Sequence, residues 1–108
     1  MMVPMEIDVR ELDRRRRGGE AITVLDVREP WEVELCTIEG SRALPMDTIP
    51  EHLDELPRDS MLVIVCHHGV RSGRAAAWLR AHGFDNAVNL AGGIDAWARE
   101  IEPSMRTY

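Results

Sequence analysis

Short apolar runs alternate along this chain with stretches of helical periodicity. Residues 61–65 are entirely apolar, and residues 22–27 are rich in β-branched side chains, so both predict strands buried between two layers. Residues 87–90 and 43–44 predict two shorter strands. The stretches between them predict helices at residues 9–17, from Pro30 onward, from residues 48–51 onward, at 72–82 and at 94–101.

Strands that alternate with helices predict a three-layer α/β fold, in which helices flank a mostly parallel central sheet. The chain has 108 residues, which suits a single domain over 1–108. In such sheets, ligands collect beyond the carboxyl ends of the strands. The loop that begins at Cys66 follows the clearest strand and is therefore expected at that end.

Charge and composition limit the classes of partner that the protein is expected to bind. Apolar residues make up 44% of the chain and the net charge is -6, which suits a globular domain and disfavours nucleic acid as a partner. The arginines at 14–17 are expected to form a solvated helix end; a basic patch for nucleic acid is the alternative. No apolar run approaches the ~20 residues of a membrane helix, and acidic residues near the start do not fit a secretory signal. We expect a cytoplasmic protein with no membrane partner.

The two cysteines do not form a disulfide scaffold or a CxxC pair. Cys36 and Cys66 are far apart in the sequence, and Cys66, His67 and His68 are consecutive, which is poor spacing for joint chelation. We therefore expect no metal and no cofactor. A reduced cysteine remains available for chemistry.

The segment from Cys66 to Arg71 has the features of a nucleophilic site. A buried strand ends at Cys66, and a helix begins within about six residues, so amide groups of the loop and the positive helix end can surround the sulfur. Gly69 permits unusual backbone angles, and Arg71 adds a permanent charge. These elements stabilise a thiolate. The alternative is a buried cysteine that merely ends a strand.

Four segments, in this order, resemble the rhodanese-like sulfurtransferases in their small single-domain form. They are Leu25-Asp26-Val27-Arg28-Glu29-Pro30-Trp31-Glu32, Ile38-Glu39-Gly40-Ser41 with Leu44-Pro45-Met46, Cys66-His67-His68-Gly69-Val70-Arg71-Ser72, and Leu90-Ala91-Gly92-Gly93-Ile94-Asp95-Ala96-Trp97. The resemblance implies a cysteine that takes sulfane sulfur from a donor such as thiosulfate, becomes a persulfide, and passes the sulfur to cyanide or to a thiol of a small molecule or protein.

The resemblance also assigns the site. Cys66 becomes the catalytic residue, and the rest of the loop becomes the substrate-binding segment, namely His67, His68, Gly69, Val70, Arg71 and Ser72. Asp26 and Arg28 either line the pocket or form an ion pair that braces the loop, and we favour the brace. The three tryptophans predict core packing, and Trp31 is near enough to the first motif to flank the pocket.

Other functions stay open at this stage. Related folds with a Cys-x5-Arg loop hydrolyse phosphate esters or reduce arsenate, but here only four residues separate Cys66 from Arg71. A non-catalytic binding or regulatory module and a redox protein that exchanges disulfides between Cys36 and Cys66 are two further alternatives. Many family members carry Gly-His-Ile where this chain has Cys36-Thr37-Ile38, so the consequence of Thr37 is open.

Overall fold

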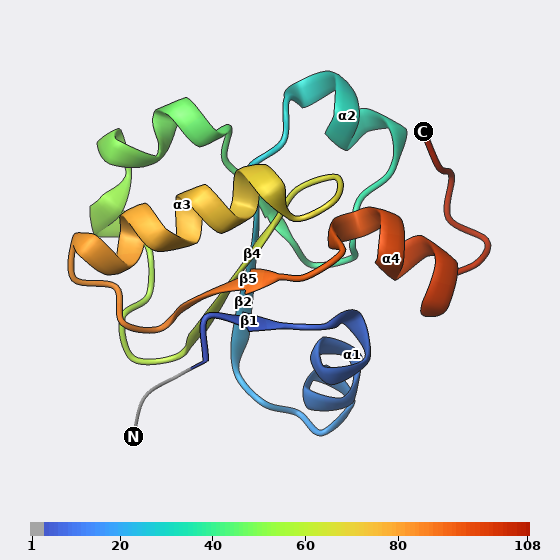
Figure 1. Cartoon of the computed structure of the whole chain (residues 1–108), viewed down its shortest axis with the longest axis horizontal. Helices are drawn as coiled ribbons and strands as arrows, with labels where there is room; N and C mark the ends of the chain where they lie inside the picture. The colour runs from blue at the N-terminus through green and yellow to red at the C-terminus, as the bar shows by residue number, and fades with distance from the viewer. Residues whose placement is uncertain (1–3) are drawn as a thin grey trace.

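The computed structural model describes residues 4–108 and forms five parallel strands in the order β1-β5-β4-β2-β3 (Figure 1). The strands are β1 (Glu6–Ile7), β2 (Ile22–Asp26), β3 (Arg42–Ala43), β4 (Met61–Val65) and β5 (Ala87–Leu90). The helices are α1 (Val9–Arg17), α2 (Pro30–Leu35), α3 (Val70–Ala81) and α4 (Gly93–Glu100), with 3-10 helices η1 (Met46–Glu51) and η2 (Leu53–Glu55). No helix in this part of the chain has the length and apolar character required to cross a membrane.

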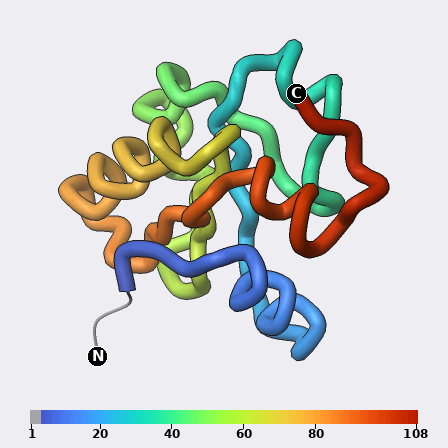
Figure 2. The backbone as a smooth tube through the Cα atoms, turned by 45° about the vertical axis from the view of Figure 1, so that its right-hand side comes forward, coloured from blue at the N-terminus to red at the C-terminus, as the bar shows by residue number. Residues whose placement is uncertain are grey.

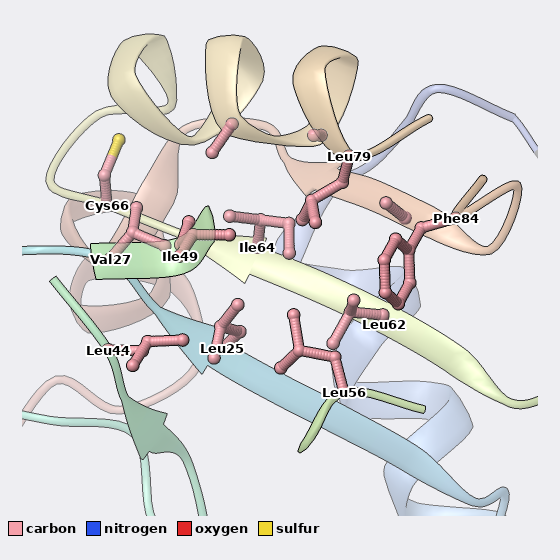
Figure 3. Packing of buried hydrophobic residues seen from close by; sticks show 13 residues of the cluster. Leu25, Val27, Leu44, Ile49, Leu56, Leu62, Ile64, Cys66, Leu79 and Phe84 are labelled. Carbon is pink, nitrogen blue, oxygen red and sulfur yellow. The ribbon is translucent and has the colours of Figure 1, made fainter. Parts of the chain in front are cut away.

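The sheet is covered on both faces, as the uninterrupted apolar strands predict. Because side chains alternate along a strand, Leu62 and Ile64 of β4 pack under α3 and the 3-10 helices, whereas Val63 and Val65 pack against α1 and α4. Figure 3 shows the first of these clusters, with Cys66 at one end of it. The fold is therefore the predicted three-layer α/β architecture.

One expected helix is replaced. The stretch that begins at residues 48–51 forms the two short 3-10 helices rather than one α-helix. Pro50 lies inside η1 and cannot donate a backbone hydrogen bond, which limits helical continuation there. The expected apolar side chains still reach the core, since Ile49 and Leu56 are buried and Leu53 packs against them.

Two other details differ from the sequence-based expectation. Strand β1 has only two residues, too few to produce a hydrophobic pattern, and it was not predicted. Trp31 is 59% exposed, so the expectation that it packs in the core is wrong; at the start of the short helix α2 its side chain faces outward. Trp97 is buried, and Trp78 is half-buried against the core.

The arginine-rich end of α1 is a solvated helix end. The Asp8 side chain accepts a hydrogen bond from the Glu11 amide and begins the helix. Arg14 and Arg15 both pair with Glu11, and Arg17 pairs with Asp13. These carboxylates offset the cations, which weakens the basic-patch interpretation.

Candidate active site

Cys66 lies directly after β4, where the carboxyl ends of β2 and β5 flank it. Its side chain is buried, and the loop that follows reaches the first residue of α3 within four positions. Gly69 stands just before the helix with φ of 103°, a left-handed conformation that other residues rarely adopt. The sequence therefore brings the sulfur to the ligand-binding edge of the sheet and to a helix N-terminus.

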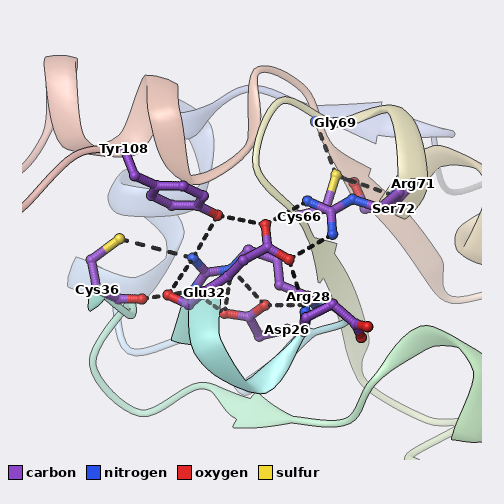
Figure 4. A network of polar contacts seen from close by, with 10 residues as sticks. Asp26, Arg28, Glu32, Cys36, Cys66, Gly69, Arg71, Ser72 and Tyr108 are labelled. Carbon is purple, nitrogen blue, oxygen red and sulfur yellow. Dashed lines mark hydrogen bonds and ion pairs between the residues drawn. The ribbon is translucent and has the colours of Figure 1, made fainter. Parts of the chain in front are cut away.

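The Cys66 sulfur is surrounded by hydrogen-bond donors. The amides of Gly69 and Ser72 donate to Sγ over 3.1 and 3.3 Å, and the Ser72 hydroxyl lies 3.2 Å from it (Figure 4). A backbone N–H can only donate, so the sulfur acts as the acceptor, and the negative thiolate accepts better than the thiol. The loop thus stabilises the nucleophilic form of Cys66.

The Ser72 hydroxyl connects this sulfur to β5. It lies 2.5 Å from Asn89 Oδ1, and Asn89 Nδ2 donates to the Gly69 carbonyl over 3.1 Å. A hydroxyl has one proton, so Ser72 can donate it either to the amide oxygen or to Sγ. When Cys66 is a thiolate, the Ser72 hydroxyl can therefore donate its proton to the sulfur instead of to Asn89 Oδ1.

The first turn of α4 holds the loop from the opposite side. The amides of Ile94 and Asp95 donate to the carbonyls of Cys66 and His67 over 2.9 and 3.0 Å. A Cβ built on Gly93 would lie 2.4 Å from the His67 oxygen, so only glycine permits this approach. With these two carbonyls drawn toward α4, the loop is free to present later amides to the sulfur.

Arg71 forms a two-pronged ion pair rather than an open rim charge. Its two terminal nitrogens each lie 2.8 Å from an oxygen of Glu32, whose side chain is 4% exposed. Glu32 also accepts from the Glu29 amide and the Tyr108 hydroxyl, each over 2.9 Å. The Arg71 contact, aided by these donors, lowers the pKa of Glu32 to about 2 against the effect of burial, and the same pair raises the pKa of Arg71.

Asp26 and Arg28 form a buried ion pair beneath this contact. Arg28 is fully buried and lies 2.7 Å from the Asp26 carboxylate; it also donates to the Cys36 carbonyl and to the Tyr108 hydroxyl over 2.7 and 3.0 Å. Burial by itself would lower the pKa of Arg28, but the hydrogen bonds to Asp26 and Tyr108 outweigh it and raise that pKa. This arrangement supports the bracing role.

The C-terminal segment returns to the site. In Figures 1 and 2 it runs back from α4 toward α2, and Tyr108 stacks on the His67 ring with centroids 3.9 Å apart. Burial and the neighbouring His68 lower the pKa of His67, so it is neutral near pH 7. Trp31 meets the edge of Tyr108, whereas Val70 is 66% exposed at the start of α3.

One group of side chains within residues 4–108 could hold a metal ion. The ligand atoms of His67, His68 and Asp95 all lie within 4.8 Å of one another. However, the two imidazole rings stack with centroids 3.9 Å apart, and Asp95 already pairs with Arg99. The contacts that form here are aromatic and ionic, and the expected absence of a metal stays a prediction.

A groove of about 640 Å³ lies beside Arg71, which is one of its lining residues. Its walls come from α3, from η1 and from the loop after β2; the lining residues are Val27, Glu29, Met46, Asp47, Ile49, Pro50, Arg71, Arg74, Ala75 and Trp78. Most of this surface is apolar, and the charged residues Glu29, Asp47, Arg71 and Arg74 also line it. The active-site loop therefore has a closed side and an open side.

Sequence reasoning missed three residues of the site. Glu32 stands three positions after Glu29 at the start of a helix, which is the spacing of a capping box, so a contact from its side chain to the backbone was the available signal. Asn89 interrupts an apolar strand, which marks a buried polar residue that needs partners. Tyr108 carries no sequence signal, because only the fold brings the end of the chain back to α2.

Residues 8–100 match the rhodanese-like domain family, and the chain belongs to that family. It is similar to a sulfurtransferase of Allochromatium vinosum, with 40% identity over 98 residues that cover 91% of this chain and 92% of the relative. It is also 39% identical, over 94% of its length, to a probable adenylyltransferase/sulfurtransferase MoeZ of Mycobacterium tuberculosis. The chain spans only 26% of that larger protein.

Solved structures agree with this membership. A rhodanese-related protein from Thermoplasma volcanium superposes with a TM-score of 0.82 at 35% identity, over 93% of this chain and 96% of that one. A rhodanese-like domain protein from Staphylococcus aureus gives a TM-score of 0.84 at 31% identity, over 97% and 99% of the two chains. Both support the assigned fold over nearly the whole length.

Proposed function

We propose that this chain is a sulfurtransferase that carries sulfane sulfur on Cys66. The observation that carries the proposal is the set of donors around the buried Sγ, from the Gly69 amide, the Ser72 amide and the Ser72 hydroxyl. Membership of the rhodanese-like family and the similarity to proteins named as sulfurtransferases support it. The substrates we propose are a donor such as thiosulfate and an acceptor that is cyanide or a thiol, on a small molecule or a protein.

The reaction divides into two sulfur transfers. In the first, the Cys66 thiolate attacks the outer sulfur of thiosulfate; a new S–S bond forms, the old one breaks, and sulfite leaves with the electron pair. In the second, cyanide or a thiolate attacks the outer persulfide sulfur and releases the Cys66 thiolate. Sulfite leaves in the first step and the Cys66 thiolate leaves in the second, and both are anions. Amide donors that stabilise negative charge on sulfur therefore favour both steps.

The loop size supports this function over phosphate chemistry. Four residues separate Cys66 from Arg71, and Arg71 is already engaged by Glu32. A tetrahedral phosphate needs several donors directed at its oxygens, as well as an acid for the leaving group. A single persulfide sulfur needs less room, and we propose that the amides of the loop, including those of His67 and His68, receive it.

The test is the intact mass of the protein after incubation with thiosulfate. We expect a gain of one sulfur, about 32 Da, which cyanide removes. Cys66→Ala should show no gain while keeping the wild-type circular dichroism spectrum, and Cys36→Ser is the matched control that should still load. An unchanged wild-type mass with every donor tried would instead favour a binding module, and sulfur on Cys66→Ala would disprove the assigned carrier.

A further inference from the structure

One wall of the groove beside Arg71 is a single face of helix α3. Arg71, Arg74, Ala75 and Trp78 recur at three- and four-residue spacing, so they lie on one face of α3. The opposite wall is part of η1, chiefly Met46 and Ile49. From Arg71 to Trp78 the helix advances about 10 Å, which is room for a small organic molecule.

This groove adjoins the nucleophile. Val27 and Ala75 line it and belong to the same packed cluster as Cys66. Figure 3 shows Cys66 beside Val27 and near Ile49, under the first turns of α3. A compound in the groove would therefore lie against Val27 and Ala75, which share a packed cluster with the buried Cys66.

The charged residues that line the groove differ in how they are paired. Arg71 is neutralised by Glu32, whereas Arg74 is exposed and has no ion-pair partner among residues 4–108. Glu29 and Asp47 also line the groove, so its lining combines apolar side chains with two carboxylates and the Arg74 guanidinium.

We propose that this groove binds the organic part of the sulfur donor, an apolar body that carries an anionic group. Met46, Ile49 and Trp78 pack against the body, and Arg74 binds the anion. The inference rests on the proposed sulfurtransferase activity of Cys66 and adds a donor class to it. Thiosulfate lacks an apolar body and would leave the groove unfilled.

An aryl thiosulfonate is a suitable probe. The Cys66 thiolate attacks its terminal sulfur, an S–S bond forms to that sulfur, and the bond from it to the sulfonyl sulfur breaks. The electron pair leaves with the aryl sulfinate, so charge and electrons balance without an added oxidant or reductant. The aryl ring is then the part that meets the groove.

The experiment compares kcat/KM for sulfur loading from methanethiosulfonate and from para-methyl, para-carboxy and para-aminomethyl benzenethiosulfonates. We expect the para-methyl compound to exceed methanethiosulfonate by at least about tenfold through apolar burial. We expect the para-carboxy compound to exceed the para-methyl compound by about threefold through Arg74. Arg74→Ala should remove the carboxylate advantage, and Met46→Gln should lower all aryl rates by about threefold while sparing thiosulfate.

The control is Arg10→Ala, which removes an exposed arginine on α1 that pairs with Glu100 and should change none of these ratios. Equal rates for all thiosulfonates, or a para-aminomethyl compound preferred over the para-carboxy one, would overturn the inference. Calorimetry with the unreactive para-sulfobenzoate separates it from the proposed function: binding that Arg74→Ala weakens supports the groove even if no donor loads sulfur. No binding to the wild-type protein would refute it.

Discussion

The two sides of the Cys66 loop are built in opposite ways. On one side, the first turn of α4 holds the loop through backbone hydrogen bonds. The arginine network, which we define as Arg28, Glu32, Arg71 and Tyr108, adds the half-buried Arg71–Glu32 ion pair and the fully buried Arg28. On the other side, the groove between α3 and η1 is apolar and open.

This difference assigns two tasks to two sides of the site: the polar side positions the Cys66 loop, and the apolar groove is the proposed donor-binding surface. Buried polar groups that satisfy one another stabilise a single arrangement, because any displacement leaves a charge or donor unpaired. An apolar surface with few polar groups places weaker demands on what it contacts. We therefore expect changes on the network side to disturb the fold and the loop together, and changes in the groove to alter donor preference alone.

The largest effect is expected at Gly93, where α4 meets the loop. In Gly93→Ala the new methyl group would lie 2.4 Å from the carbonyl oxygen of His67, so the loop must move. We expect the free energy of unfolding to fall by about 3 kcal/mol and sulfur loading to slow by about 100-fold. Chemical denaturation and loading rates measure the two effects.

Gly19→Ala is the matched control for that change. Gly19 also has a left-handed backbone, with φ of 79°, but no atom lies within 4 Å of its built Cβ. It should lose about 1–2 kcal/mol of unfolding free energy through backbone strain and retain the wild-type loading rate. Equal effects of the two substitutions would show that the contact between α4 and the loop contributes nothing.

The second effect concerns Glu32, whose negative charge is the centre of the network. Glu32→Gln should lower the free energy of unfolding at pH 7 by about 2–3 kcal/mol, because Arg71 loses its charged partner but can still reach solvent. Glu34→Gln on the same helix is exposed and should change stability by less than about 0.5 kcal/mol.

The Glu32 contribution should also depend on pH. Its pKa falls from 4.5 to about 2 on folding, so the stabilisation is complete above about pH 4.5 and is lost as the pH drops toward 2. The difference between wild-type and Glu32→Gln protein should therefore shrink by up to about 3 kcal/mol across that interval. A difference that stays constant from pH 7 to pH 2 would contradict the low pKa.

The sequence predicted the layers and the nucleophile better than it predicted this network. Apolar strands and glycine-flanked helices are local patterns, so Met61–Val65, the Cys66 loop and the short helix at Val9–Arg17 were all found where expected. For Arg71 the sequence predicted a permanent charge but no partner, because the residue that pairs with it stands 39 positions earlier in the chain. A contact across that distance depends on how α2 is placed over the strand ends, which no local pattern encodes.

Tyr108 provides a smaller test of the network. Tyr108→Phe keeps the ring that stacks on His67 and removes only the hydroxyl between Arg28 and Glu32. We expect a loss of about 1 kcal/mol in unfolding free energy and a change in loading of less than about threefold. Burial raises the pKa of Tyr108 above its ordinary value of 10, so the loss should be constant near neutral pH and shrink as the pH rises through that ordinary value. A larger effect on loading than on stability would give the hydroxyl a direct part in the chemistry.

The smallest effect is expected at Cys36, the other cysteine. Its sulfur lies 3.8 Å from a terminal nitrogen of Arg28, and Figure 4 shows Cys36 and Cys66 on opposite sides of the network. A disulfide needs Cβ atoms about 4 Å apart, so exchange between the two would require Arg28 and Glu32 to separate. Cys36→Ser should therefore leave transfer to cyanide and to a thiol acceptor within about twofold of wild type. If steady-state transfer to the thiol falls about tenfold while loading is unchanged, Cys36 resolves the persulfide, and the network opens during turnover.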